Sequence, residues 1–271
     1  MQPLPFPPAN KRLGQNFLID PNIVRKIVTL AEITPETVVL EIGPGRGVLT
    51  EALSKAAGHV VAVEIDPVLH RLLQERQADW PNVELVCGDA LVYPLERLPA
   101  GTVVVANLPY YISTPLMFRL LDCRECFPRM VLMLQNEVAD RLVARPGTAD
   151  YGVLSLMAQY AAHITKAFKV SAQCFRPRPE VGSAVVLLRR KESPPLKSEE
   201  EPRFAALVKA AFAHRRKTLV NSLRDEGYDH ALVVGALNEM EILPTIRAES
   251  LSLEQFIALT QRVDSGRTRL N

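Results

Sequence analysis

The feature that most constrains this chain is the stretch between Thr37 and Val105, where short runs rich in Val, Ile and Leu alternate with helical patterns. The runs are VVLEIG, VVAVEID, VELVCGDA and TVVVANLPY. Their apolar residues are continuous rather than alternating, which indicates strands buried on both faces, as in a parallel sheet covered by helices. The pattern therefore predicts an α/β domain with a doubly wound, mostly parallel sheet.

The rest of the chain extends this domain and adds a second one. Three further runs, at residues 129–135, 167–170 and 183–190, bring the predicted strands to about seven. Asp20 and Pro21 begin a helical pattern with one apolar face, because Asp as a cap and Pro at the first position both favour a helix start. We place the main domain at residues 1–190 and a linker at 191–202, where KESPPLKSEEEP is rich in proline and charge.

Residues 203–271 are predicted to form a small helical C-terminal domain. The helical patterns are FAALVKAAFAHRRKTLVNSLRDEG, HALVVGALNEM and SLEQFIALTQRV. Ser252 is the predicted cap of the last of these helices.

Composition excludes several classes of protein. Of the 271 residues, 48% are hydrophobic and 23% are charged, which is typical of a globular chain. The N-terminal segment is broken by prolines, and no run approaches the roughly 20 apolar residues of a membrane helix, so we expect a cytoplasmic protein. Cys123 and Cys126 form a C-x-x-C without the second pair of a zinc site. We therefore predict reduced thiols and no metal.

Strand ends carry the residues that predict a ligand site. Gly43 and Gly45 follow the first of the four runs, Glu64 ends the second, Asp89 follows the third and Asn107 ends the fourth. Ligands of open α/β sheets bind at the carboxyl ends of the strands, so we expect these residues to meet. The glycines permit close backbone approach, the glutamate can hold both hydroxyls of a ribose, and the aspartate can accept a hydrogen bond from an adenine amino group.

The glycine loop favours S-adenosylmethionine over a nicotinamide dinucleotide as cofactor, although the spacing to Glu64 fits both. The sequence GPGRG departs from G-x-G-x-x-G, and Pro44 removes a backbone donor that a pyrophosphate would use. S-adenosylmethionine carries no phosphate and needs fewer donors. A nicotinamide dehydrogenase is the alternative, and the absence of a downstream catalytic His or Lys motif disfavours it.

The sequence Asn107-Leu108-Pro109-Tyr110 predicts methylation of the exocyclic N6 of adenine. The lone pair of this nitrogen is delocalised into the purine ring, and two acceptors for its hydrogens, the Asn107 side-chain oxygen and the Leu108 carbonyl, would localise it. Pro109 fixes the turn that presents this carbonyl. Tyr110 supplies a face for a base taken out of its stack, and Phe175 is the candidate for the opposite face.

Five motifs are spread over nearly the whole chain. They are KRLGQNFL at residues 11–18, EIGPG in the glycine loop, NLPYYISTPLMF after the fourth run, RPRPEVGSAVVLL after Phe175, and HRRKTLVNSL in the C-terminal region. Together they resemble the KsgA-type small-subunit rRNA adenine N6,N6-dimethyltransferases, which are close kin of the Erm large-subunit methyltransferases.

The resemblance implies a Rossmann-like class I S-adenosylmethionine-dependent methyltransferase domain with a seven-stranded sheet. It implies that Asn16 and Leu18 contact the methionine end of the cofactor, and that the strand-end residues line the rest of the pocket. It also implies that two adjacent adenines in the 3′-terminal hairpin loop of 16S rRNA are dimethylated in immature 30S subunits. A role in subunit biogenesis follows from this.

Basic residues form local clusters although the formal net charge is only +2. Such clusters can neutralise phosphates, whereas the structural alternative is a solvated helix face. We predict RNA contacts at Lys11, Arg12, Arg176, Arg178, Arg215, Arg216 and Lys217. The expected partner is 16S rRNA in the immature 30S subunit, bound by a monomer without any membrane association.

Two other functions stay open at this point. The first is an Erm-like methyltransferase of large-subunit RNA, which the long C-terminal helical region and HRRKTLVNSL disfavour. The second is a binding protein, such as a subunit-assembly factor, in which the methyltransferase fold is only a platform. The intact glycine loop and the residues from Asn107 to Tyr110 disfavour a purely non-catalytic role.

Overall fold

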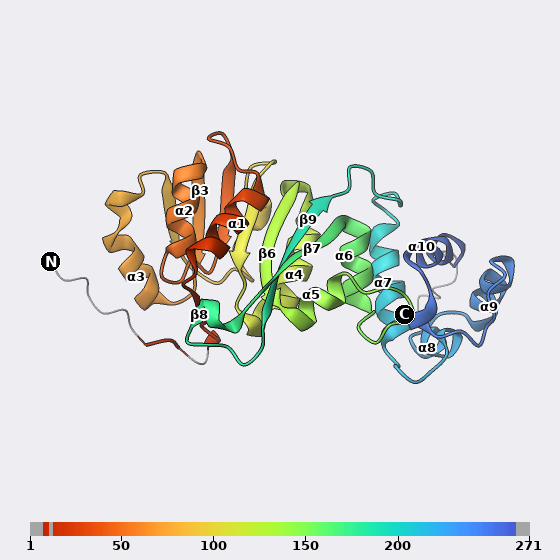
Figure 1. Cartoon of the computed structure of the whole chain (residues 1–271). Coiled ribbons are helices and arrows are strands. Elements are labelled where there is room, and N and C mark those ends of the chain that lie inside the picture. Colours follow the sequence, from red (N-terminus) through yellow and green to blue (C-terminus); the bar gives the residue numbers. More distant parts are fainter. Residues whose placement is uncertain (1–7, 11–12, 264–271) are drawn as a thin grey trace. The chain divides into compact units, whose positions relative to one another are not determined.

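The structure is a computed structural model that describes residues 8–10 and 13–263, and it divides into two compact units (Figure 1). Unit 1 comprises the chain up to Asp140 together with Ala162–Arg190, and unit 2 comprises Arg141–Ala161 together with the chain from Lys191 onward. Residues 141–161, which we expected in the first domain, thus group with the helical unit. Their apolar side chains explain this, because Tyr151, Leu156 and Tyr160 belong to the core of unit 2.

A seven-stranded sheet forms the centre of unit 1, in the order β4-β3-β2-β5-β6-β9-β7 (Figure 1). The strands are β2 (Val38–Ile42), β3 (His59–Glu64), β4 (Val83–Cys87), β5 (Val103–Asn107), β6 (Arg129–Gln135), β7 (Ala162–Val170) and β9 (Ser183–Arg190). The neighbouring strands from β4 to β6 pair in parallel, and β9 runs antiparallel to both β6 and β7. The predicted mostly parallel α/β sheet is confirmed.

Helices α1 (Pro21–Ala31) and α2 (Val48–Ala56) pack on the sheet through their apolar faces. The carboxylate of Asp20 accepts a hydrogen bond from the backbone N–H of Asn22 at 2.8 Å, which confirms the predicted start of α1. Ile27 of α1 and Leu53 of α2 are fully buried in this core, and each such side chain contributes roughly 1.5–3 kcal/mol by burial. The remaining helices that begin in unit 1 are α3 (Pro67–Glu75), α4 (Ser113–Asp122) and α5 (Asn136–Leu142).

A short two-stranded ladder joins distant parts of unit 1. Strand β1 (Phe17–Leu18) pairs antiparallel with β8 (Phe175–Arg176), so that Leu18 lies opposite Phe175. This ladder fixes the segment that precedes α1 beside the segment that follows β7.

Unit 2 contains α6 (Val153–Ala161), α7 (Glu201–Phe212), α8 (Leu219–Asp225), α9 (His230–Glu239) and α10 (Leu253–Arg262). Aromatic rings pack in its core, where Tyr160 is stacked on Phe204 at a centroid distance of 4.7 Å. Helix α10 begins at Ser252 with the reciprocal side-chain to backbone bonds of a capping box, as predicted.

The pattern from FAALVKAAF through LVNSLRDEG predicted a single helix. This prediction is wrong, because the chain forms two helices there. Helix α7 ends at Phe212, and α8 begins after Thr218, whose hydroxyl accepts a hydrogen bond from the N–H of Asn221 at 3.4 Å. A Thr in the cap position satisfies an orphan donor at a helix start, so it favours a new helix here over continuation of the first one.

Candidate functional site

A pocket lies at the carboxyl ends of β2, β3 and β5, as the strand-end residues predicted. Its wall is formed mainly by residues 13–18, the glycine loop, the end of β3 and the segment after β5. The predicted site residues in this wall are Asn16, Leu18, Gly43, Gly45, Glu64, Asn107, Leu108, Pro109 and Tyr110. The fold therefore brings together residues that are up to 94 positions apart in the sequence, as Asn16 and Tyr110 are.

The glycine loop and Glu64 hold each other in place. The backbone N–H of Gly45 donates to one carboxylate oxygen of Glu64 at 2.9 Å, and the N–H of Asp66 donates to the other at 2.9 Å. Gly45 has φ of +59°, and a Cβ at this position would lie 3.1 Å from the ring of Phe17. Only glycine suits both conditions. The Glu64 carboxyl, whose pKa is raised by burial, is thus fixed in the pocket wall.

Asn107 and Leu108 present two acceptor oxygens at the end of β5. The Asn107 side-chain nitrogen donates to the backbone carbonyl of Asn16 at 3.2 Å, and the Leu108 N–H donates to the carbonyl of Met133 at 3.1 Å. Within residues 8–10 and 13–263, no donor reaches the Asn107 side-chain oxygen or the Leu108 carbonyl oxygen. Two adjacent acceptors in a pocket wall are suited to bind an amino group.

Two tyrosines follow these acceptors. The Tyr110 hydroxyl forms a 2.8 Å hydrogen bond with the Ser183 hydroxyl, which fixes a half-buried ring in the pocket wall. Burial raises the pKa of this phenol, so Tyr110 stays neutral over the physiological range. Tyr111 also lines the pocket but leaves 46% of its surface exposed. The pair gives this edge an aromatic rim.

Asp89 lies next to this edge but is not part of the pocket wall. One of its carboxylate oxygens accepts the N–H of Leu91 at 2.8 Å. Burial is the largest cause that raises the pKa of Tyr111, and the negative charge of Asp89 is the second. The Asp89 carboxylate therefore lies near the aromatic rim. Contact of Asp89 with the adenine of a cofactor therefore stays a prediction.

Phe175 does not occupy the position that we predicted for it. Its ring has 0% exposed surface and packs in the core of unit 1, with Leu18 opposite it in the β1–β8 ladder. A ring without exposed surface offers no face to a base, so the stacking contact is absent from this arrangement. The physical reason is that the ladder turns this side chain toward the core between the sheet and α1.

Among the polar and charged side chains of the pocket wall, sequence reasoning missed Gln15, Glu41 and Arg46. The Gln15 side chain donates to the Asp66 carboxylate at 2.8 Å, and the Arg46 guanidinium lies over the ring of Phe17 at 4.3 Å. These two contacts depend on the fold and leave no signal in the sequence. Glu41 does leave a signal in the sequence, because it is an ionisable residue inside a continuous apolar strand.

The charges of the pocket wall decide between the two cofactors considered above. In the described wall, Arg46 is the one Lys or Arg side chain, whereas Glu41 and Glu64 contribute two carboxyl groups. A pyrophosphate would meet carboxyl groups here, whereas a phosphate-free ligand with a positive charge would be favoured by them. The residues therefore fit S-adenosylmethionine, and the buried Glu41 oxygen without a hydrogen-bond partner among the described residues is consistent with a cationic ligand.

The predicted RNA-binding residues lie in three places. Arg176 ends β8, Arg178 follows it, and both are exposed, whereas Lys11 and Arg12 lie outside the described residues. Arg215, Arg216 and Lys217 belong to the turn between α7 and α8. With Arg141 and Arg247 they line a second hollow, which is formed entirely by residues of unit 2.

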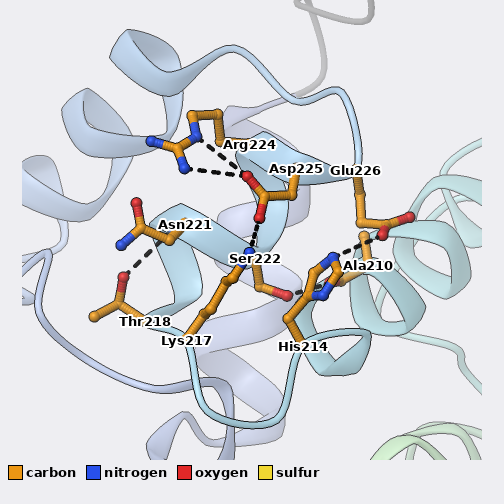
Figure 2. Close-up of polar contacts among 9 residues, drawn as sticks. All are labelled: Ala210, His214, Lys217, Thr218, Asn221, Ser222, Arg224, Asp225 and Glu226. Carbon is orange, nitrogen blue, oxygen red and sulfur yellow. Dashed lines mark hydrogen bonds and ion pairs between the residues drawn. The ribbon is translucent and has the colours of Figure 1, made fainter.

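Ion pairs fix the turn between α7 and α8 (Figure 2). The Lys217 ammonium pairs with the carboxylate of Asp225, and His214 Nε2 lies 3.1 Å from a carboxylate oxygen of Glu226. Arg215 and Arg216 are exposed and form no ion pair with the part of the chain that the structure describes. Two of the three predicted cations therefore face solvent without a carboxylate partner among the described residues.

The described residues contain neither a candidate metal site nor a helix that could span a membrane. No group of three or more His, Cys, Asp or Glu side chains in residues 8–10 and 13–263 is arranged to hold a metal ion. Within the same residues, no helix is both long and apolar enough to cross a membrane.

The sheet and the residues at its carboxyl edge define a class I S-adenosylmethionine-dependent methyltransferase. The model of the family described as ribosomal RNA adenine dimethylase matches residues 8–265. The chain belongs to this family, and it is an rRNA adenine dimethyltransferase with S-adenosylmethionine as methyl donor.

Relatives and solved structures agree with this assignment. A ribosomal RNA small subunit methyltransferase A of Moorella thermoacetica is 44% identical over 93% of this chain and 91% of its own. A dimethyladenosine transferase from Plasmodium falciparum has a TM-score of 0.79 with 29% identity, covering 90% of this chain and 95% of its own. The 23S rRNA methyltransferase ErmE has a TM-score of 0.72 with 30% identity, covering 92% of this chain and 100% of its own.

Proposed function

We propose that this enzyme dimethylates N6 of two adjacent adenines in the 3′-terminal hairpin loop of 16S rRNA, within immature 30S subunits and as a step in their biogenesis. The choice of small-subunit RNA is supported by the higher identity to a relative named for the small subunit, 44%, than to a 23S rRNA methyltransferase, 30%. The motif HRRKTLVNSL in unit 2 supports the same choice. A monomer that acts in the cytoplasm stays our expectation.

One observation carries the chemistry: Asn107 and Leu108 both line the pocket, and neither the Asn107 side-chain oxygen nor the Leu108 carbonyl oxygen accepts a hydrogen bond from the described residues. S-adenosylmethionine, when bound, supplies an electrophilic methyl group on a sulfonium. The two oxygens accept the hydrogens of the adenine amino group and so localise its lone pair. As the nitrogen becomes positively charged, the same acceptors stabilise its N–H bonds more strongly than in the ground state.

Tyr110 positions the base in this proposal. Its ring, fixed through Ser183, offers a flat apolar surface at the pocket wall on which an extruded adenine stacks. No general base is needed before methyl transfer, because the methylated nitrogen is a far stronger acid than the amine and loses its proton to water.

Methylation of purified subunits with isotope-labelled cofactor tests the proposed target. Immature 30S subunits and 23S rRNA, both from cells that lack the modification, are incubated separately with the enzyme. We expect mass spectrometry to find dimethyladenosine at two adjacent adenines of 16S rRNA, and primer extension to stop there. Label in 23S rRNA but not in 16S rRNA would reject the small-subunit target in favour of the Erm-like alternative.

The exposed arginines of the turn between α7 and α8 are proposed to bind RNA phosphates. Replacing both in the double variant Arg215→Ala/Arg216→Ala should weaken binding to immature 30S subunits, because each lost phosphate contact lowers the slope of log affinity against log salt by about 1. Binding measured at several salt concentrations checks this. Arg262→Ala is the control, since Arg262 is an exposed cation of the same unit outside the basic hollow. An unchanged slope in the double variant would contradict this assignment.

A further inference from the structure

Glu41 is a buried acid that the mechanism above does not use. It is the fourth of the five residues of β2, and its register partners are Ala62 on β3 and Val105 on β5. Its side chain is 1% exposed, yet it forms part of the pocket wall. Its Oε2 atom is buried and finds no hydrogen-bond partner among the described residues. A buried carboxyl in this state is unfavourable as an anion unless a cation reaches it.

Among residues 8–10 and 13–263, no Lys or Arg side chain forms an ion pair with the Glu41 carboxyl. The titratable and charged groups that line the pocket with Glu41 are Glu64 on β3, Arg46 in the glycine loop, and Tyr110 and Tyr111 after β5. Helix α2 carries Glu51 and Lys55. Lys55 is paired with Glu51 at 2.9 Å. Arg46 lies over the Phe17 ring, and Glu64 is itself negative, so its field disfavours a second charge at Glu41.

Burial raises the pKa of the Glu41 carboxyl to about 8, and the charge of Glu64 acts in the same direction. At neutral pH the ligand-free pocket therefore holds a protonated Glu41. The strand register places this carboxyl near the chemistry, because Glu41 pairs with Val105, two residues before Asn107 on the same face of the sheet. The methyl that is transferred must lie close to Asn107, and the sulfonium that carries it lies within a few ångströms.

We infer that Glu41 is the counter-ion of the cofactor: its carboxyl loses a proton when the cationic methyl donor enters the pocket. The O–H bond breaks, the electron pair stays on the carboxylate, and the proton passes to the solvent. Glu41 is thereby a specificity residue that favours a positively charged ligand over a neutral nucleoside of similar shape. The inference concerns the cofactor alone, so its outcome is independent of which RNA is methylated.

The sign of the pH dependence follows from this proton release. Below the pKa of the free carboxyl, each S-adenosylmethionine that binds must displace a proton, so affinity rises with pH by up to about tenfold per unit. Above that pKa the carboxylate is already formed and this contribution levels off. The affinity for a neutral nucleoside contains no such pH-dependent contribution.

Isothermal titration calorimetry at pH 7 in buffers of different ionisation enthalpy counts the protons released on binding. The ligands are S-adenosylmethionine and the neutral 5′-methylthioadenosine, which has the same adenosine but neither sulfonium nor ammonium. We expect the wild-type protein to release up to about one proton more with the cation than with the neutral ligand. Glu41→Gln should lose this difference, because Gln imitates the protonated carboxyl but cannot ionise.

The comparison of the two ligands on the wild-type protein stands even if Glu41→Gln does not fold, which its thermal melting shows. Equal proton release with both ligands would overturn the inference, since it would mean that filling the pocket alone moves the proton. Undiminished release from a folded Glu41→Gln protein with S-adenosylmethionine would overturn it as well, because another group would then be the donor.

Discussion

Asn107→Ala should lower the rate of methyl transfer by about 10²- to 10³-fold, the usual effect of removing one preorganised polar group from a reacting centre. The variant loses the side-chain oxygen that accepts a hydrogen from the adenine amino group, while the Leu108 carbonyl remains. Single-turnover methylation of the RNA substrate with labelled cofactor measures this effect. A rate equal to that of the wild-type protein would refute the mechanism.

A second variant separates chemistry from structure at this position. The Asn107 nitrogen also donates to the Asn16 carbonyl, so alanine removes a link between β5 and the segment before α1. Asn107→Asp keeps an acceptor oxygen but loses this donor. We expect it to be more active than the alanine variant although both lack the link. Melting temperatures and the affinity for S-adenosylmethionine show whether either change acts through the fold instead.

The sheet and the position of the site were predictable because both follow from local patterns. Continuous apolar runs indicated buried strands, and the residues that end them, such as Gly43 and Glu64, had to meet at one edge once the strands were parallel. The capped helix starts at Asp20 and Ser252 were equally local. In each case the information lies within a few residues, so one sequence is enough to reveal it.

Contacts between distant segments were not predictable in the same way. The hydrogen bond from Asn107 to Asn16 spans 91 positions, and no local pattern specifies it. The grouping of residues 141–161 with the helical unit depends on which core accepts Tyr151 and Tyr160, a choice made by packing. The break between α7 and α8 has a different cause, because Thr218 caps a new helix inside a continuous helical pattern.

Phe175 is the clearest case in which one residue type fitted two roles. An aromatic ring beside a proline-rich segment is as suitable for stacking on a base as for filling a core, and its sequence neighbours do not distinguish these. The structure places the ring in the core of unit 1, paired with Leu18 in the ladder between β1 and β8, and it is not part of the pocket wall. The two roles predict different consequences when the ring is removed.

Phe175→Ala should destabilise the protein by about 3–5 kcal/mol, because it removes a fully buried ring and leaves a cavity in the core of unit 1. In a domain of this size such a loss lowers the melting temperature by about 10 °C.

Phe175→Leu fills most of the volume and should retain more of the stability, while both variants lack an aromatic face. Thermal unfolding and single-turnover methylation of the two variants, compared at a temperature where both are folded, separate the roles. A core role predicts that Phe175→Leu keeps nearly full activity, whereas a loss of methylation in a stable Phe175→Leu protein would mean that the ring leaves the core to stack on the base.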